Sequence, residues 1–205
     1  MRYNLYAITD YRWDTQTMLD KVEKAVAGGI DVLQYRPKNI ETLDMIKQAG
    51  SLQEIITPHN IPLIINDAVD VAKTVDADGV HLGQNDMKAK SARDYLGNSA
   101  IIGLSVGNMQ ELKNLDVSVV DYVGIGAVYE TGTKSNAGKP IGVDGFKALR
   151  DKILIPCVAI GGITLNNAKA LIDNGSDGIA VISGLFETQD ITETAINFKN
   201  LYNKK

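Results

Sequence analysis

The fold can be predicted from residues 156–184, which read PCVAIGGITLNNAKALIDNGSDGIAVISG. An apolar run at 156–160 is followed by two glycines and then by a segment of helical spacing that begins at Thr164 and ends at Gly175. A second apolar run occupies residues 178–182. This order of strand, helix and strand predicts two parallel strands joined by a right-handed crossover.

The same alternation runs through the rest of the chain. Several of the apolar runs are almost continuous, which is typical of parallel strands buried on both faces. Apolar residues at helical spacing mark the segments between them, for example Leu43, Ile46, Ala49, Leu52 and Ile55. We expect eight strands, at residues 5–9, 32–36, 62–66, 79–82, 101–106, 122–128, 156–160 and 178–182.

Eight strand–helix units predict an α/β protein with the (β/α)8 TIM-barrel fold. An open, doubly wound sheet is the alternative that the same alternation allows. No linker rich in Pro, Gly or Ser and no shift in composition divides the 205 residues. We therefore expect a single catalytic domain that spans residues 1–205.

Four aspartates repeat at equivalent places in this pattern. Asp31, Asp78, Asp121 and Asp177 each come directly before an even-numbered strand. We expect them in the short turns at the amino-terminal end of the barrel, where residues contribute to stability rather than to catalysis.

Composition excludes several classes of protein. The chain has 21 Lys and Arg against 25 Asp and Glu, a net charge of −4, and no long basic run that would indicate nucleic-acid binding. A single cysteine, Cys157, cannot form an intramolecular disulfide, and two histidines are too few for a His-rich zinc site. The longest apolar stretch, 153–163, is far shorter than the about 18 residues of a membrane span, and the amino-terminal residues lack an apolar signal core. We expect a cytoplasmic globular protein that acts on small molecules and binds neither nucleic acid nor membrane. The sequence leaves a homo-oligomer open.

The carboxyl ends of the strands form the active site of a TIM barrel, and this rule selects the candidate residues. Gln34, Arg36 and Lys38 follow the second strand and share one side of an extended segment, because they are spaced two residues apart. Such a run favours an anion-binding site over a solvated loop. Asn66 comes at the end of the third strand, and Ser105 comes near the end of the fifth.

Two carboxylates accompany this cationic run. Asp67 comes after the third strand and Asp86 after the fourth. Each could be a cap instead, Asp67 of the following helix and Asp86 of a turn. Carboxylates at neighbouring strand ends favour Mg²⁺ bridging a diphosphate, because Mg²⁺ binds one or two carboxylates together with substrate phosphates and water.

A second anion site is predicted at the last three strands. The run Thr131-Gly132-Thr133-Lys134 follows the sixth strand and supplies two hydroxyls and an ammonium, in a loop long enough to cover a ligand. Gly161 and Gly162 follow the seventh strand, and Ser183 and Gly184 follow the eighth. Loops at these two places commonly bind phosphate through backbone N–H groups.

No pair of a nucleophile and a general base stands out in the sequence. His59 precedes the third strand, at the wrong end of the barrel, and we expect His81 to be a packed histidine within the fourth strand. Cys157 is expected in the core. Tyr11 and Trp13 follow the first strand and could either line the rim of a pocket or pack. The chemistry would then rest on a metal ion and on electrostatic stabilisation.

Six motifs resemble those of the thiamine phosphate synthase family, in order and over nearly the whole chain. They are QYRPK at 34–38, IIND at 64–67, GVHLGQNDM at 79–87, GLSV at 103–106, TGTK at 131–134 and VAIGGI at 158–163. The resemblance implies a TIM-barrel transferase that uses Mg²⁺. Its substrates would be 4-amino-2-methyl-5-(diphosphooxymethyl)pyrimidine and a thiazole phosphate, and its products would be thiamine phosphate and pyrophosphate.

The resemblance also implies a role for individual residues. Those implied to hold the pyrimidine diphosphate are Gln34, Arg36, Lys38, Asn66, Ser105 and Lys134. Those implied to be catalytic are Arg36, Lys38, Ser105 and Lys134. Those implied to bind the thiazole phosphate are Thr131, Thr133, Gly162, Ile182 and Ser183, and those implied to bind Mg²⁺ are Asp67 and Asp86. The implied mechanism is dissociative: pyrophosphate departs first, and the thiazole nitrogen then attacks the pyrimidine methylene cation.

Two alternatives remain beside this interpretation. The related thiazole tautomerase is similar in fold and phosphate site, but its catalytic histidine would align with Ala127, and its pyrimidine-diphosphate residues are degraded. A non-catalytic barrel that senses phosphorylated thiazole or thiamine would not need Asp67, Asp86 and Lys134. Ala127 also replaces the proline that is usual in the synthase family, a change that removes no ligand-binding group.

Overall fold

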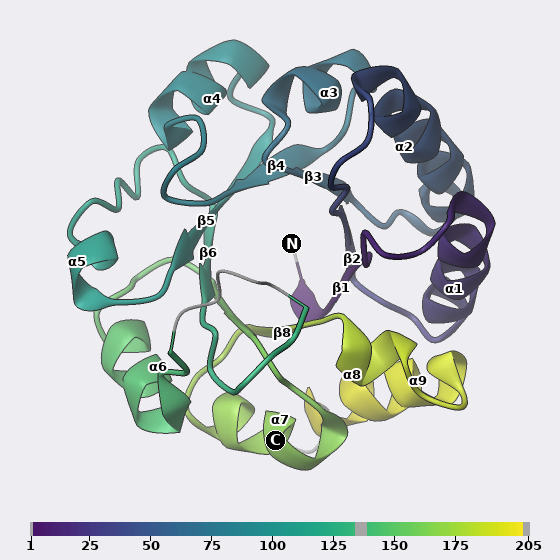
Figure 1. The fold of residues 1–205 in the computed structure, drawn as a ribbon. Coiled ribbons are helices and arrows are strands. Elements are labelled where there is room, and N and C mark those ends of the chain that lie inside the picture. The colour runs from purple at the N-terminus through teal and green to yellow at the C-terminus, as the bar shows by residue number, and fades with distance from the viewer. Residues whose placement is uncertain (1, 134–138, 203–205) are drawn as a thin grey trace.

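The computed structural model of the protein describes residues 2–133 and 139–202. They form a closed barrel of parallel strands in chain order, in which β1 pairs with both β2 and β8 (Figure 1). The strands are β1 (Tyr3–Ile8), β2 (Val32–Tyr35), β3 (Leu63–Asn66), β4 (Gly79–Leu82), β5 (Ile101–Val106), β6 (Tyr122–Ile125), β7 (Cys157–Ile160) and β8 (Gly178–Val181). Because the sheet closes on itself, the open sheet is excluded and the predicted TIM barrel is confirmed.

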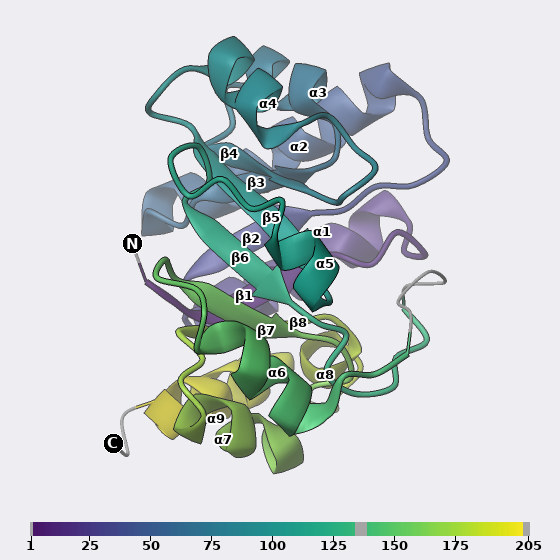
Figure 2. The same ribbon diagram turned by 90° about the vertical axis from the view of Figure 1, so that its left-hand side faces the viewer.

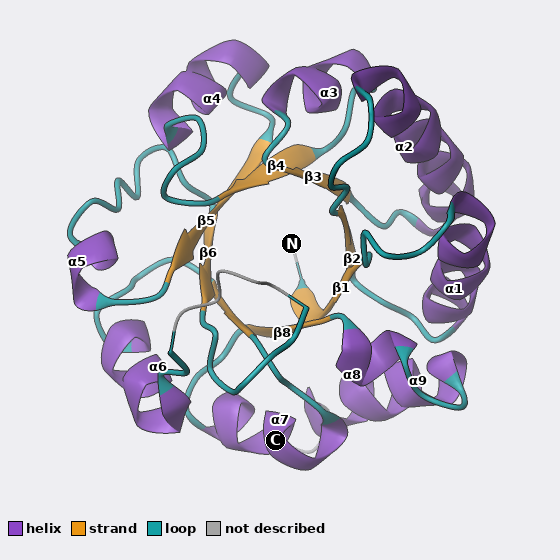
Figure 3. Ribbon diagram, in the orientation of Figure 1, coloured by secondary structure: helices purple, strands orange, loops and turns teal. Residues whose placement is uncertain are grey.

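Helices form a ring outside the strands (Figure 3). Seen from the side, the strands lie between α3 and α4 on one side and α7 and α9 on the other (Figure 2). The helices of the described ranges are α1 (Thr15–Ala27), α2 (Thr42–Ile56), the 3-10 helix η1 (Thr57–His59), α3 (Val69–Thr74), α4 (Ala89–Leu96), α5 (Met109–Leu112), α6 (Gly142–Arg150), α7 (Leu165–Asp173), α8 (Ser183–Phe186) and α9 (Ile191–Tyr202). Within these ranges, every helix is too short or too polar to span a bilayer.

Two apolar layers hold the barrel together. Strand residues alternate between them, so that in β1 Leu5 and Ala7 face the helices while Tyr6 and Ile8 face the barrel interior. The interior layer also contains Tyr122. Its tyrosines place hydroxyl groups inside the barrel, where burial requires hydrogen-bond partners. The barrel interior is therefore partly polar.

The four aspartates before the even-numbered strands lie at the amino-terminal end of the barrel, as predicted. The carboxylate of each accepts a hydrogen bond from a backbone N–H at or near the start of the preceding odd-numbered strand. The four bonds join Asp31 to Leu5 (2.9 Å), Asp78 to Leu63 (2.8 Å), Asp121 to Ile102 (2.7 Å) and Asp177 to Cys157 (2.8 Å). The same contact thus ties each odd strand to the next even strand, away from the carboxyl ends.

The structure differs from the predicted pattern by one residue at several strand ends and by more in three places. β1 begins at Tyr3 rather than at residue 5, because the polar Asn4 does not interrupt the strand. β6 ends at Ile125 rather than at residue 128, because Gly126 begins the loop to α6. In α2 the first residue of the predicted apolar stripe is not buried, because Leu43 is 71 % exposed. At the other end of the helix, Ile56 extends the buried face. A stripe read at fixed spacing drifts around a helix over several turns.

Candidate active site

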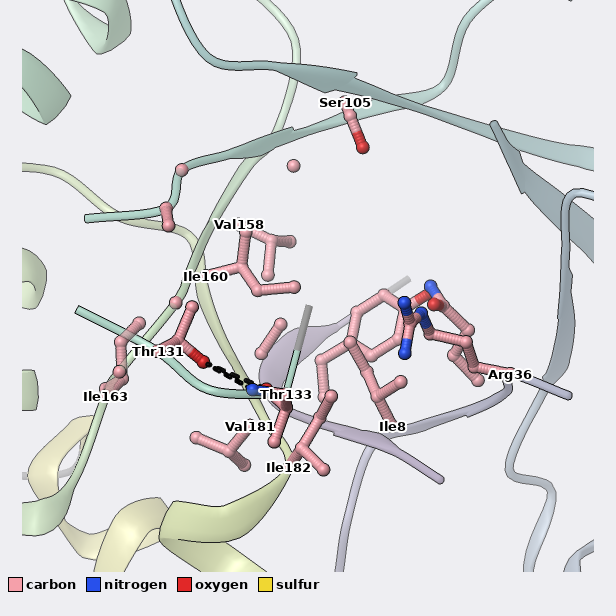
Figure 4. Close-up of a pocket in the computed structure, with 18 of the residues that line it drawn as sticks. Ile8, Arg36, Ser105, Thr131, Thr133, Val158, Ile160, Ile163, Val181 and Ile182 are labelled. Atoms are coloured by element: carbon pink, nitrogen blue, oxygen red, sulfur yellow. Dashed lines mark hydrogen bonds between the residues drawn. The ribbon is translucent and has the colours of Figure 1, made fainter. Parts of the chain in front are cut away.

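One pocket opens at the carboxyl ends of the strands and reaches into the barrel interior. It encloses about 970 Å³ of space, counting its open mouth, and its wall takes residues from every strand of the barrel. Figure 4 shows Ser105, Arg36 and Thr131 around the opening, each on a different side. Much of the wall is apolar, including Val158 and Ile160. A mostly apolar cavity with a few polar groups is typical of sites for small molecules.

Arg36 brings a buried cation into this pocket. Its backbone N–H donates to Oγ1 of Thr9 (2.9 Å), and the residue is only 7 % exposed. Its side-chain nitrogen Nη1 is buried, and no described residue accepts a hydrogen bond from it. Burial lowers the pKa of Arg36 from its ordinary value, although the charges of Asp67 and Asp10 oppose this shift. Because a guanidinium stays charged in proteins, the unbonded Nη1 fits an anionic oxygen of a ligand.

Tyr11 is an exposed residue beside this cation. The centroid of its ring is 5.7 Å from Cζ of Arg36 and 5.4 Å from Nζ of Lys38, which are distances typical of cation–π contacts. Trp13 packs instead against Phe186, with 5.1 Å between the ring centroids. Trp13 therefore packs, whereas Tyr11 contacts the two cations without belonging to the pocket wall.

Asp10 is a charged residue near this end of the barrel that sequence analysis missed. It follows β1 and is 3 % exposed. Its Oδ1 accepts hydrogen bonds from the backbone N–H (3.0 Å) and Nε (2.9 Å) of Arg12. Burial alone would raise the pKa of Asp10, but the hydrogen bonds and charge of Arg12, helped by Arg36, bring it below its ordinary value. Its position directly after the first strand was a signal that could have found it.

Asp67 and Asp86 lie at the ends of the neighbouring strands β3 and β4. The N-cap position of α3 is Ala68, one residue after Asp67. Asp86 does close a turn, because its Oδ2 accepts a hydrogen bond from the N–H of Gly83 (2.7 Å). This bond uses one carboxylate oxygen and leaves Oδ1 of Asp86 without a hydrogen-bond donor among the described residues. Capping a turn and binding a cation are therefore compatible for Asp86.

The donor atoms of these two carboxylates suit Mg²⁺, which binds oxygen ligands and keeps several waters. In the part of the chain that the structure describes, no group of three or more His, Cys, Asp or Glu side chains could hold a metal ion. A cation at Asp67 and Asp86 would therefore take further ligands from substrate phosphates and water. The residues present fit such a shared site.

A chain of hydrogen bonds crosses the barrel interior at the floor of the pocket. Nε2 of Gln34 donates to the hydroxyl of Tyr6 (2.8 Å), which lies 2.6 Å from the hydroxyl of Tyr122. That hydroxyl lies 2.9 Å from Nδ1 of His81, whose Nε2 lies 2.9 Å from Oγ of Ser105. His81 is thus inside the barrel as predicted, and it also contacts a predicted substrate residue. Sequence analysis missed the two tyrosines, although their alternation in the strands places them inward.

The loops after β6, β7 and β8 form the opposite wall of the pocket. Oγ1 of Thr131 lies 2.9 Å from Oγ1 of Thr133 (dashed in Figure 4). Gly162 has a φ of 63°, and a Cβ at this position would collide with the carbonyl oxygen of Glu130. Glycine at position 162 therefore lets the loop after β7 approach the loop that carries the two threonines. Ile182 and Ser183 also line the pocket here.

The structure brings most of the predicted residues to one place. The predicted residues that line the pocket are Gln34, Arg36, Asn66, Ser105, Thr131, Thr133, Gly162, Ile182 and Ser183. Three lie outside its wall: Lys38 over the ring of Tyr11, and Asp67 and Asp86 after β3 and β4. Lys134 lies outside the described residues. The roles of all these residues stay predictions.

Comparison with known proteins identifies the family. A model of the thiamine monophosphate synthase family matches residues 5–185, which include every strand of the barrel except the start of β1. The chain belongs to the thiamine monophosphate synthase family. The predicted resemblance is thereby confirmed, and with it the predicted enzyme class.

Relatives from this family match nearly the whole chain. The thiamine-phosphate synthase of Clostridium novyi (strain NT) is 44 % identical over 202 residues, which cover 98 % of this chain and 99 % of the relative. That of Azorhizobium caulinodans is 45 % identical over 199 residues, with coverages of 97 % and 94 %. A solved structure of thiamine phosphate pyrophosphorylase from Pyrococcus furiosus is similar with a TM-score of 0.87 at 32 % identity, covering 98 % of this chain and 96 % of that chain.

Proposed function

We propose that the protein joins 4-amino-2-methyl-5-(diphosphooxymethyl)pyrimidine to a thiazole phosphate, and so forms thiamine phosphate and pyrophosphate. The observation that carries the proposal is the buried guanidinium of Arg36, whose Nη1 has no acceptor among the described residues, in a pocket with polar groups at two ends. One pocket with two such ends fits two phosphorylated substrates. Molecules with these charges do not cross a bilayer unaided, so we place the reaction in the cytoplasm.

The ends of β2 and β3 are suited to the diphosphate. Arg36 supplies a buried charge and Lys38 adds a second charge nearby, and the ring of Tyr11 contacts both. Asn66 lines the same side of the pocket and supplies an amide. Attraction between opposite charges is stronger in a partly buried site than in water. These side chains would therefore bind the diphosphate before any chemical step.

Asp67 and Asp86 would hold Mg²⁺ beside the diphosphate. When bound, the metal ion would neutralise charge on the phosphate oxygens and make pyrophosphate a better leaving group. Asp67 is close enough to Arg36 to influence its pKa, so the metal site and the buried cation adjoin. The two would contact the same substrate group.

The chain's own cations would assist the departure of pyrophosphate. As the bond between the methylene carbon and the diphosphate oxygen breaks, negative charge grows on that oxygen. Arg36 and Lys38 would stabilise this charge, and preorganised charges of this kind are among the largest contributions to catalysis. Lys134, outside the described residues, is proposed to act in the same way on the strength of the family motif. The positive charge on the methylene carbon is shared with the electron-rich aminopyrimidine ring.

The loops after β6–β8 would hold the second substrate. Thr131 and Thr133 offer hydroxyls, and Gly162, Ile182 and Ser183 complete the wall that would surround the thiazole phosphate. The thiazole nitrogen attacks the methylene carbon with its own lone pair. The step therefore needs correct orientation of the two rings rather than a protein nucleophile.

Turnover by the purified protein tests this function. Incubation with both substrates and Mg²⁺ should yield thiamine phosphate and pyrophosphate in equal amounts. Arg36→Gln should lower kcat/KM by about 100-fold or more, whereas Lys147→Gln, on the exposed face of α6, should leave it unchanged. Release of pyrophosphate without thiamine phosphate, or full activity of Arg36→Gln, would contradict the proposal.

A modified substrate tests the dissociative order of steps. Trifluoromethyl in place of the methyl group on the pyrimidine withdraws electrons and destabilises the methylene cation, but leaves the diphosphate contacts intact. Single-turnover measurements should show a slower chemical step and nearly unchanged binding, as expected for an effect on the transition state alone. A trifluoromethyl substrate that reacts as fast as the native one would favour direct displacement by the thiazole nitrogen.

A further inference from the structure

The hydrogen-bond chain from Gln34 to Ser105 has a direction. Nε2 of Gln34 donates to the hydroxyl of Tyr6, so among these partners the proton of Tyr6 is paired only if it is donated to the hydroxyl of Tyr122. The proton of Tyr122 is then paired only if it is donated to Nδ1 of His81. With Nδ1 as an acceptor, a neutral imidazole carries its hydrogen on Nε2 and donates it to Oγ of Ser105.

This direction decides what each end of the chain offers to a ligand. Oγ of Ser105 accepts from His81, so its own proton is available to an acceptor on the ligand. At the other end, Nε2 of Gln34 is engaged with Tyr6, which leaves the carbonyl oxygen Oε1 of Gln34 to accept from a ligand. Both Gln34 and Ser105 line the pocket. The pocket therefore presents a donor at Ser105 and an acceptor at Gln34, and both depend on residues beneath its surface.

The barrel interior is built around this chain. Tyr6 and Tyr122 are each 1 % exposed, and burial raises the pKa of both hydroxyls far enough that they keep their protons. A Cβ on Gly103 of β5 would collide with the ring of Tyr122 and with Nδ1 of His81. A Cβ on Gly124 of β6 would lie 3.0 Å from Cε1 of His81. The two glycines thus leave the space that the imidazole and phenol rings occupy.

We propose that Tyr6, Tyr122 and His81 are positioning residues that hold Ser105 as a donor and Gln34 as an acceptor toward an aminopyrimidine ring. The inference rests on the proposed function, because this ring belongs to the first substrate. An aminopyrimidine carries an exocyclic N–H donor and ring nitrogens that accept, so it can satisfy both groups. If these hydrogen bonds ran in the opposite direction, Gln34 would present a donor to the amino group of the ring. Buried polar groups would then be left unpaired, which costs binding free energy.

The tautomer of His81 tests the direction of the chain without substrate or turnover. The protein has two histidines, and His59→Gln removes the exposed one in η1, so the remaining imidazole signals in ¹⁵N NMR spectra belong to His81. We expect the hydrogen on Nε2 and none on Nδ1. A hydrogen on Nδ1, or on both nitrogens, would overturn the inference. Tyr122→Phe removes the donor to Nδ1 and should change the tautomer; an unchanged tautomer would show that Tyr122 does not set it.

Two substitutions at His81 separate positioning from packing. His81→Gln keeps an amide nitrogen that can reach Ser105, whereas His81→Asn is too short to do so. The Kd for the pyrimidine diphosphate, measured by titration calorimetry, should rise roughly tenfold in His81→Asn and much less in His81→Gln. The Kd for the thiazole phosphate should not change in either variant. Equal losses in the two variants, or equal weakening of both substrates, would indicate a packing role and overturn the inference.

The outcomes distinguish this inference from the proposed function. If the protein forms no thiamine phosphate but His81 carries its hydrogen on Nε2, only the proposed function is contradicted. If the protein forms thiamine phosphate but the hydrogen lies on Nδ1, only the inference is contradicted.

Discussion

Replacement of Arg36 by methionine should make the protein more stable and nearly inactive. Nη1 of Arg36 is buried without an acceptor among the described residues, and a buried donor without a partner costs about 1–3 kcal/mol. The contact with Tyr11 (5.7 Å) and the charges of Asp67 and Asp10 offset part of this cost, of which the aromatic ring contributes roughly 0.5–1 kcal/mol. Methionine keeps an apolar stem and removes the charge. We expect a net gain of about 1 kcal/mol in unfolding free energy.

Arg93 is the matched control, because it is a mostly buried arginine at the other end of the barrel whose Nη1 and Nη2 both donate hydrogen bonds. Its side chain is 12 % exposed. It donates to the carbonyl oxygens of Gly97, Asn98, Ala100 and Val119 and to the carboxylate of Asp121. Arg93→Met should therefore lower the unfolding free energy by about 2–4 kcal/mol and leave kcat/KM of the folded protein unchanged. The two substitutions should therefore change stability in opposite directions, and only Arg36→Met should reduce activity.

Calorimetry with and without the pyrimidine diphosphate measures both effects. Without ligand, Arg36→Met should unfold about 2–4 °C above the wild type. Saturating ligand should raise the melting temperature of the wild type, because it binds only the folded state, and should barely move that of Arg36→Met. A variant that melts below the wild type, and that the ligand still stabilises fully, would refute the reasoning that Arg36 is held unpaired for an anion.

Three further predictions concern carboxylates. The pKa of Asp10 is lowered on folding, so its contribution to stability is complete above about pH 4 and is lost as the pH falls through the lower pKa of the folded state. This acid dependence should be absent from Asp10→Asn in urea unfolding at a series of pH values. The same acid dependence in the variant and the wild type would count against this prediction. Asp177→Ala removes the hydrogen bond to the N–H of Cys157 and should lower the unfolding free energy by about 1–3 kcal/mol without changing kcat. A change in kcat would mean that this end of the barrel takes part in function. Asp67→Asn and Asp86→Asn should each raise the Mg²⁺ concentration needed for half-maximal activity, and an unchanged Mg²⁺ titration in either variant would remove that residue from the metal site.

The alternation of apolar runs and helical stripes predicted the barrel because each strand and helix is specified locally. The rule that the active site lies at the carboxyl ends of the strands then selected Gln34, Arg36, Asn66 and Ser105 without knowledge of any contact. The same rule applies to Asp10, which lies two residues after the end of β1. That residue was within reach of the argument and was overlooked.

The interior hydrogen-bond chain lay beyond such reasoning. Tyr6 and Tyr122 are 116 positions apart, and their hydroxyls meet only because the closed barrel brings β1 and β6 across its interior. His81 and Ser105 meet through the register of β4 with β5 and the space beside Gly124. Local patterns carry no information on such contacts. The exposure of Leu43 likewise depends on where the first turn of α2 lies relative to its neighbours, which spacing alone does not specify.

Titration calorimetry of each substrate separately, on two variants, tests most directly whether the pocket holds two substrates at two ends. The variants are Arg36→Met, at the end of β2, and the double substitution Thr131→Val and Thr133→Val, in the loop after β6. Arg36→Met should weaken the pyrimidine diphosphate roughly 10- to 100-fold and leave the Kd of the thiazole phosphate unchanged, and the double variant should show the reverse pattern. If each variant weakened both substrates equally, the pocket would not be divided in this way and the assignment of the two ends would be wrong.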